Sequence, residues 1–219
     1  MMIEMSFSLF TNHYSPRTGG ESVYIYLNKI DSTNEEAKRR IRANKIVEDS
    51  LVVADTQSAG KGQLGRKWVS KKDVGIYMSI IKKTNLPLKD IQEVTLVAGL
   101  TVHEVLSKYL KSYGLKLKYP NDVLVNGKKL CGILTESISR DNNYLIVGIG
   151  INVNNKEFPQ IEGNVPTSLH LETGNYFSRK DIVTAVTKKF YENFEKYIVK
   201  KENYNDKYEK IALRHPEER

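Results

Sequence analysis

The order of hydrophobic and polar positions along the chain predicts an α+β fold. Runs of β-branched and aromatic residues predict strands, and apolar positions that recur at three- and four-residue intervals predict helices. Most predicted strands follow one another in the middle of the chain, which favours a mixed, largely antiparallel sheet with helices packed on one side over a regular βαβ alternation. The expected strands are 22–28, 51–56, 75–81, 115–119, 122–125, 129–138 and 144–152, and the expected helices are 35–43, 90–109 and 179–200.

Local signals add detail to this outline. Asn126-Gly127 lies between two of the strands and predicts a two-residue hairpin turn. Ser32 and Glu35 have the spacing of a capping box, which would begin the first helix. Residues 57–70 form a polar, glycine-bearing loop, and residues 154–178 are expected to be irregular.

Composition limits the class of protein. The chain has 219 residues, 40% hydrophobic and 27% charged, as in an ordinary globular domain. No apolar run reaches the ~18 residues that a membrane span needs, and the N-terminus does not resemble a secretory signal. The single Cys131 excludes an internal disulfide and favours a reducing compartment. We therefore expect a cytoplasmic protein that is not bound to a membrane.

The net charge of +8 favours an anionic partner, either nucleic acid, an acidic protein or a small anion. A lysine-rich solvated surface explains the same charge without a partner. The chain carries no basic stripe with interleaved aromatic residues, of the kind that single-strand binders use. A basic nucleic-acid-binding module stays an alternative, which a steep salt dependence of DNA binding would support.

The segment 60–68 (GKGQLGRKW) is the most informative for chemistry. Its three glycines let the backbone bend sharply and approach a ligand, and its three cations favour an anion. Strands flank it and no helix follows, so it fails the context of a dinucleotide fingerprint or a Walker-type phosphate loop. It is an anion-binding loop or, alternatively, a mobile basic surface loop. The cations are Lys61, Arg66 and Lys67.

Three further segments hold candidate site residues. Lys118, in KYPND (118–122), stands at a strand end, where it enters a cleft or is simply solvated. The glycines of GIGINVN (148–154) weaken a strand unless something approaches closely, or they mark a β-bulge against a helix. Residues 32–34 (STN) cap a helix or hydrogen-bond a small polar ring.

In this order, these segments resemble the biotin–protein ligase family. The resemblance runs from about residue 22 to residue 200 and implies a fold related to the core of class II aminoacyl-tRNA synthetases. It also implies a two-step reaction, in which biotin and MgATP give biotinyl-5′-AMP and a carrier-protein lysine then attacks the mixed anhydride. The matching segments are 31–34 (DSTN), Gln57, 60–68, 118–122, 129–134 (KLCGIL), 148–154 and 167–169 (TSL).

The resemblance assigns roles to individual residues. It implies that Lys118, Lys61 and Arg66 stabilise the charge that develops where the biotin carboxylate meets the α-phosphate. Trp68 would pack the closed loop, Asn152 would serve ATP, and Mg²⁺ would be held by phosphates and water rather than by a dedicated protein site. The remaining residues expected to bind biotin or ATP are Ser32, Thr33, Asn34, Gln57, Gly60, Gly62, Gln63, Asn121 and Gly132.

Two positions depart from the family pattern in a way that predicts a property. The loop often reads glycine-arginine-glycine-arginine in the family, whereas this chain has Gly60-Lys61-Gly62-Gln63. Lys61 keeps the charge but loses the bidentate fork of arginine, and Gln63 loses the charge. We therefore expect weaker retention of biotinyl-AMP.

The resemblance also frames the domains and the partners. It predicts a catalytic domain over residues 1–200, with 201–219 as a tail or the start of a truncated or absent C-terminal β-barrel. Too few residues precede the first strand for an N-terminal helix-turn-helix domain, so no DNA binding of that kind is expected. The expected partner is a biotin carboxyl carrier protein, and a homodimer is plausible by resemblance. The alternatives are a lipoate–protein ligase and a non-catalytic biotin or adenylate sensor.

Overall fold

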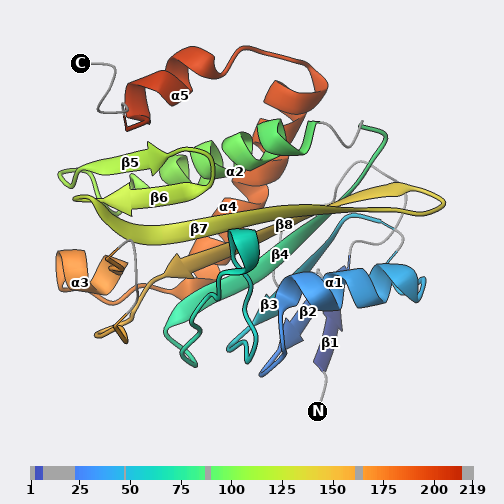
Figure 1. Ribbon diagram of the computed structural model, residues 1–219, viewed down its shortest axis with the longest axis horizontal. Helices are drawn as coiled ribbons and strands as arrows, with labels where there is room; N and C mark the ends of the chain where they lie inside the picture. Colours follow the sequence, from blue (N-terminus) through green and yellow to red (C-terminus); the bar gives the residue numbers. More distant parts are fainter. Residues whose placement is uncertain (1–2, 7–22, 47, 87–89, 161–164, 214–219) are drawn as a thin grey trace.

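The structure is a computed structural model that describes residues 3–6, 23–46, 48–86, 90–160 and 165–213. Its centre is an eight-stranded sheet in the order β1-β2-β3-β4-β8-β7-β6-β5 (Figure 1). Only the β2–β3 pair is parallel among these neighbours, which confirms the predicted mixed, largely antiparallel sheet. The strands are β1 (Ile3–Ser6), β2 (Val23–Leu27), β3 (Ser50–Ala54), β4 (Gly75–Thr84), β5 (Leu115–Lys118), β6 (Asp122–Val125), β7 (Lys128–Ser139) and β8 (Asn143–Asn152).

The helices are divided between the two faces of the sheet. Helices α2 and α4 pack against one face, and α1 packs against β3, β4 and β8 on the other (Figure 1). The expectation that all helices lie on one side is therefore wrong in this detail. The helical elements are α1 (Thr33–Arg42), the 3₁₀ turn η2 (Gln63–Gly65), α2 (Ile91–Leu106), α3 (Leu169–Thr173), α4 (Arg179–Asn193), the π-helix η4 (Phe194–Val199) and α5 (Asn205–Ile211).

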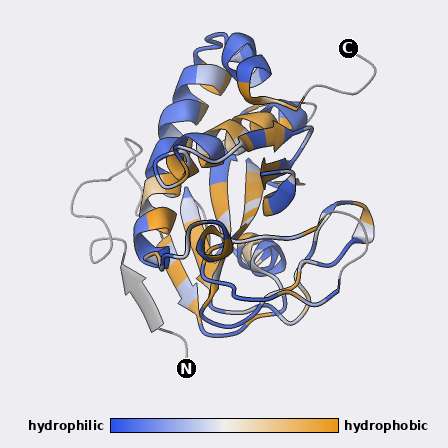
Figure 2. Ribbon diagram, turned by 90° about the vertical axis from the view of Figure 1, so that its left-hand side faces the viewer, coloured by the Kyte–Doolittle hydropathy of each residue, from blue (hydrophilic) through white to orange (hydrophobic). Residues whose placement is uncertain are grey.

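The alternation of side chains along the strands explains why both faces are covered. On β4, Met78 and Ile80 join the large core beneath α2 and α4, whereas Ile81 joins a smaller core beneath α1. Val53 and Val52 are divided in the same way on β3. Because neighbouring residues of a strand point to opposite faces, a strand that is apolar at consecutive positions must be covered twice. Figure 2 shows the hydrophobic residues gathered in the strands and hydrophilic residues on the outer loops.

Two local predictions have different outcomes. The hairpin at Asn126-Gly127 is confirmed, with the positive φ angles of 50° and 77° that a type I′ turn requires. Ser32 is the N-cap residue of α1, but its side chain makes no capping hydrogen bond, so the predicted capping box is not formed. Glu35 turns instead toward lysine partners.

Two C-terminal segments also differ from expectation. Residues 154–178 contain the short helix α3, whose N-cap Ser168 accepts a hydrogen bond from Leu171 N at 3.0 Å. A helix this short spans too few turns for its periodicity to be recognised. The predicted helix 179–200 is confirmed in position, and its last turns are a π-helix.

The final described segment lies against the domain. Tyr208 and Ile211 pack against the large core, and Leu213 N donates to Leu117 O at 2.8 Å. Residues up to 213 thus cover the outer edge of β5. Across the described ranges, no helix combines the length and the apolar character needed to span a membrane.

His103, near the end of α2, gives this packing a pH-dependent component. Its Nε2 lies 3.3 Å from Leu115 O, and burial lowers its pKa. Because the folded-state pKa lies below the unfolded value of about 6.5, stability is complete above that pH and falls as the pH drops through it toward the folded value.

We therefore predict that the free energy of unfolding declines as the pH falls from about 8 through about 6.5 and below, because the unfolded chain binds a proton at His103 more readily than the folded protein does. Urea titrations of wild type and His103→Gln across this range give the free energy of unfolding of each protein at each pH. The contribution of His103 is the difference between the two proteins. A difference that does not change with pH would contradict the assignment.

Candidate active site

The floor of the site is a part of the sheet that has no side chains. On the face covered by α1, Gly132 of β7 pairs with Gly150 of β8, and Gly148 lies one step along the same face. A Cβ at Gly150 would lie 2.5 Å from the Trp68 ring, and one at Gly148 would lie 2.4 Å from Asn34 Oδ1. The β7–β8 register is unbroken here, so close approach and not a β-bulge explains these glycines.

The glycine-rich loop folds back over this floor. Trp68 N donates to Gly60 O at 2.9 Å, and Gly62 N donates to Arg66 O at 2.7 Å, which makes a small hairpin closed by the turn η2. A Cβ at Gly60 would lie 2.6 Å from Trp68 O, so this glycine lets the two arms of the hairpin meet. The indole of Trp68 then rests on Gly132 and Gly150.

The N-terminus of α1 forms one wall. Gln57 Oε1 accepts hydrogen bonds from Thr33 N at 2.8 Å and from Thr33 Oγ1 at 3.2 Å, and Gln57 Nε2 donates to Ser70 Oγ at 3.3 Å. Gln57 therefore joins the start of α1 to the end of the loop. Ser32 is buried beside them and lines the cavity.

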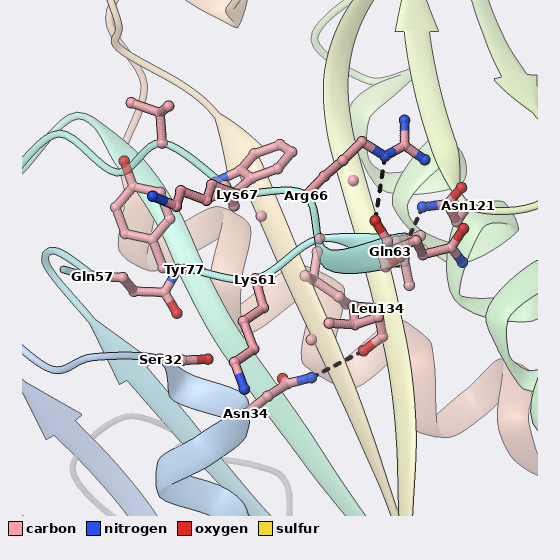
Figure 3. A pocket seen from close by; sticks show the side chains of 18 of the residues that line it. Ser32, Asn34, Gln57, Lys61, Gln63, Arg66, Lys67, Tyr77, Asn121 and Leu134 are labelled. Carbon is pink, nitrogen blue, oxygen red and sulfur yellow. Dashed lines mark hydrogen bonds between the residues drawn. The ribbon is translucent and has the colours of Figure 1, made fainter. Parts of the chain in front are cut away.

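Both the oxygen and the nitrogen of the Asn34 side-chain amide form hydrogen bonds within the protein. Its Oδ1 accepts from Ser79 Oγ at 2.6 Å, and its Nδ2 donates to Leu134 O at 3.2 Å and to Glu136 Oε2 at 2.8 Å. Asn34 lines the cavity, yet its geometry is that of a residue that fixes α1 to β4 and β7 (Figure 3).

An ion-pair chain attaches the loop to α1. Lys61 Nζ lies 2.7 Å from Glu35 Oε1, Lys38 Nζ lies 2.9 Å from the same oxygen, and Lys38 also reaches Glu136 at 2.6 Å. The hydrogen bonds from Lys61 and then from Lys38 lower the pKa of Glu35. Lys61 points from the loop toward Asn34, whereas Gln63 and Arg66 lie on the other side, beside Asn121 (Figure 3).

The far end of the site is built from β5 to β8. Lys118 is the last residue of β5 and lines the cavity. Asn121 Nδ2 donates to Ile133 O at 3.1 Å, and Asn152 Nδ2 donates to Lys129 O at 3.4 Å. These hydrogen bonds hold both asparagines beside β7.

These elements enclose a cavity of about 260 Å³. All the predicted site residues line it except Gly60, which lies against the Trp68 backbone where the two arms of the loop meet. Among the described residues that line it there are five cations and no aspartate or glutamate, so the cavity favours an anion. The cations are Lys61, Arg66, Lys67, Lys118 and Lys129.

Sequence reasoning missed several lining residues. Lys129 lies 2.7 Å from Asp122 Oδ1 and 5.6 Å from the centre of the Trp68 ring. Lys129 is the first residue of the segment 129–134 that resembles the family, and this position was the one sign in the sequence that it belongs to the site. Tyr77, Phe158 and Pro166 also line the cavity, but no pattern in the sequence marks them.

The described residues offer the indole nitrogen of Trp68 no hydrogen-bond acceptor. Within the described residues, its Nε1 is buried and makes no hydrogen bond. Buried donors in folded proteins normally have a partner, so an acceptor from a ligand would satisfy it. The described part of the chain contains no cluster of three or more histidine, cysteine or acidic side chains that could hold a metal.

Comparison with known proteins identifies the family. The model of the Biotin/lipoate A/B protein ligase family matches residues 26–154, a span that runs from β2 to just past β8 and includes most of the site. The chain belongs to this family. The match includes both glycine segments and the KYPND segment on which the resemblance was based.

Individual relatives agree with this assignment. The chain is 35% identical over 180 residues to the bifunctional ligase/repressor BirA of Bacillus spizizenii, a match that covers 80% of this chain and 54% of that protein. It is 33% identical to the biotin–[acetyl-CoA-carboxylase] ligase of Paracoccus denitrificans, over 68% of this chain and 63% of that one. The chain thus spans little more than half the length of the first of these relatives.

The fold also matches a solved relative. The biotin protein ligase of Aquifex aeolicus, solved in complex with biotin and ATP, has a TM-score of 0.74 and 36% identity to this chain. The match covers 87% of this chain and 78% of that one. The sheet that carries the cavity is therefore that of the family.

The contact between Gly150 and the indole makes a direct prediction. In Gly150→Ala, the added methyl should push Trp68 off the floor and toward water, because a Cβ there meets the ring at 2.5 Å. Trp68 is the one tryptophan in the sequence, so the emission maximum should shift to longer wavelength.

Gly99→Ala is the matched control, since a Cβ at Gly99 meets its nearest neighbour at an ordinary 3.6 Å. Its emission should equal that of wild type. If Gly150→Ala also emits like wild type, the indole does not rest on this floor.

Proposed function

We propose that the protein is a biotin–protein ligase, which activates biotin with ATP and transfers it to a lysine of a carrier protein. The observation that carries the proposal is a cavity above a glycine floor, whose described lining residues include five cations and no carboxylate. The Aquifex aeolicus relative, which binds biotin and ATP, favours biotin over lipoate as the acid.

The charge of the cavity suits the first half-reaction. A carboxylate oxygen of biotin attacks the α-phosphorus of ATP, the bond to the bridging oxygen of the β-phosphate breaks, and pyrophosphate leaves. Two like charges at ~4 Å repel by about 4 kcal/mol at an effective dielectric constant of 20. Fixed cations at the meeting point offset this repulsion and stabilise the transition state.

We assign this role first to Lys118, at the end of β5, with Arg66 and Lys61 arriving on the loop. Lys129 is added to this set, since its ammonium lies on the same side of β7 as Trp68. Lys61 is paired with Glu35, so its ammonium would have to turn from this carboxylate to a phosphate or carboxylate oxygen of the substrate.

The opposite end of the cavity suits the uncharged end of biotin. Ser32, Thr33 and Gln57 offer hydroxyl and amide groups at the start of α1, which suit the ureido group of biotin. Asn34 acts here by positioning α1. Gly60 and Gly62 let the two arms of the loop come together, and the Trp68 ring closes over Gly132. Asn121, Asn152 and Gln63 are assigned to the ATP side.

Magnesium is best treated as part of the MgATP substrate. Mg²⁺ prefers oxygen ligands and is usually held by one or two carboxylates together with phosphates. In the part of the chain that the structure describes, the residues lining this cavity include no carboxylate, so these donors do not fit a protein-held ion. No step of the mechanism depends on such an ion.

In the second half-reaction, the amine of an acceptor lysine attacks the carbonyl carbon of biotinyl-AMP. The C–O bond of the anhydride breaks, AMP leaves, and the nitrogen loses its proton to give the amide. We propose the biotin carboxyl carrier protein of acetyl-CoA carboxylase as the acceptor, which agrees with the name of the Paracoccus denitrificans relative. We also propose a cytoplasmic location, on the basis of the sequence, and a homodimer, on the basis of the family resemblance.

The role of Lys118 is tested by Lys118→Met. We predict that the rate of biotin-dependent pyrophosphate release falls about 100-fold or more, equivalent to about 2.7 kcal/mol, because the cation is lost where charge develops. Biotin affinity, measured by calorimetry, should change only a few-fold.

Lys111→Met removes an exposed lysine elsewhere and should leave the rate unchanged. Full activity of Lys118→Met would remove Lys118 from the mechanism. Tight binding of biotin by the wild type without pyrophosphate release would favour the sensor alternative.

The substitution Gln63→Arg tests retention of the intermediate. A guanidinium at this position should add charge-assisted hydrogen bonds to biotinyl-AMP, each contributing about 1.5–3 kcal/mol, and slow its release roughly 10-fold or more. Release is followed after a chase with unlabelled biotin. Gln160→Arg adds the same charge outside the cavity lining and should release the adenylate at the wild-type rate. Equal rates for Gln63→Arg and wild type would refute the predicted weak retention.

A further inference from the structure

Lys118, which receives the first chemical role, lies on a weakly supported strand. β5 has four residues and is the last strand of the described sheet, where it pairs with β6 alone. The outer side of such an edge strand exposes its main-chain groups, and weakly held segments open more readily than the core. A displacement of about 1 Å at a reacting group can lower a rate about 100-fold. The accuracy with which Lys118 is placed therefore depends on what holds the outer side of β5.

The C-terminal segment holds this outer side through its main chain. Leu213 N donates to Leu117 O at 2.8 Å, and Ala212 forms a parallel bridge with Leu117. Ala212 N donates to Tyr208 O at 2.8 Å, which joins the bridge to the end of α5. Residues 212–213 thus pair along β5 at the residue that precedes Lys118. We call residues 205–213 the C-terminal strap.

The strap is anchored in turn to the large core. α5 lies along β5 (Figure 1), and Tyr208 and Ile211 pack against the large core. Lys207 forms an ion pair with Glu104 of α2. The Leu117 carbonyl is therefore bonded to an element whose own position is fixed by packing and by charge.

The residues on either side of Lys118 determine where its side chain starts. Leu117 is buried in the large core, so Lys118, the next residue of the strand, faces the opposite side and lines the cavity. The Tyr119 hydroxyl accepts a hydrogen bond from Gln92 Nε2 of α2. Both neighbours of Lys118 are thus held by elements outside the sheet, Leu117 by the strap and Tyr119 by α2.

We propose that the C-terminal strap positions Lys118 for the adenylation step. The acting group is the main-chain N–H of Leu213, which fixes Leu117 and, through it, the backbone of Lys118. This inference rests on the proposed function, in which Lys118 stabilises the charge between the carboxylate and the α-phosphate. Leu213 and Leu117 do not line the cavity, so they are positioning residues and not catalytic ones.

Leu213→Pro tests the proposal because proline has no N–H to donate. Ala212 has φ −69° and ψ 147°, a conformation that accepts a following proline. We predict that kcat for biotin-dependent pyrophosphate release falls about tenfold, since Lys118 loses its accurate placement. The dissociation constant of biotin, measured by calorimetry, should change by less than about twofold, because the ureido group binds at the other end of the cavity.

Two further variants isolate the N–H from the side chain. Leu213→Ala keeps the N–H and shortens a side chain that is 45% exposed, so it should retain the kcat of wild type. Replacement of the Leu213 amide by an ester, introduced by ligation of a synthetic C-terminal peptide, keeps the side chain and removes the N–H. The ester should lower kcat about threefold or more, and it decides the test if thermal unfolding shows that Leu213→Pro does not fold. A loss in Leu213→Ala as large as that in the variants without the N–H would overturn the proposal.

A double-mutant cycle shows whether the strap acts through Lys118. Loss of the Leu213 N–H should lower kcat by less than about twofold in the Lys118→Met background, because the group that it positions is gone. A general loss of packing would instead lower the rate by the same factor with and without Lys118. That equal factor would refute the strap as a positioning element.

Failure of this inference differs from failure of the proposed function. If Lys118→Met is slow, but folded variants without the Leu213 N–H are as fast as wild type, the inference alone is refuted. If Lys118→Met releases pyrophosphate at the full rate, the role assigned to Lys118 fails and the inference fails with it. If the wild type releases no pyrophosphate with biotin, the proposed function itself is refuted.

Discussion

The site depends on a patch of sheet that carries no side chains. Gly132, Gly148 and Gly150 leave one face of β7 and β8 bare, and any Cβ there would collide with Asn34 or with the Trp68 ring. Without this bare patch, neither α1 nor the glycine-rich loop could lie as close to the sheet as they do. The opposite face of the same strands is apolar and buried beneath α2, so the glycines do not interrupt the core.

A second constraint is the concentration of positive charge. Five cations around one cavity repel one another, and the ion pairs of Lys61 with Glu35 and of Lys129 with Asp122 reduce this repulsion. Neither Glu35 nor Asp122 is itself among the lining residues. Exchanging these partners for anionic substrate oxygens would couple substrate binding to the position of the loop, since Lys61 is one of its residues.

Much of this could be predicted from the sequence. Strand and helix positions followed from apolar periodicity. The glycine and lysine segments indicated the site because glycines destabilise an ordinary strand and a lysine at a strand end adds nothing to its packing. The side of the sheet on which α1 packs could not be predicted, since β3 and β4 are apolar on both faces. The partners of Asn34 and Glu35 were also beyond reach, because Ser79 and Lys61 are distant in the sequence and meet only through the sheet and the loop.

The central claim is that a carboxylate and the α-phosphate of ATP meet in this cavity, and that the carboxylate is that of biotin. The most direct measurement incubates the protein with α-labelled ATP and Mg²⁺ and with biotin, lipoate or neither acid, followed by separation of the labelled products. We predict a labelled acyl-adenylate in the reaction with biotin, and none in the reactions with lipoate or without an acid. A labelled adenylate with lipoate but not with biotin, or none with either acid from folded protein, would contradict it.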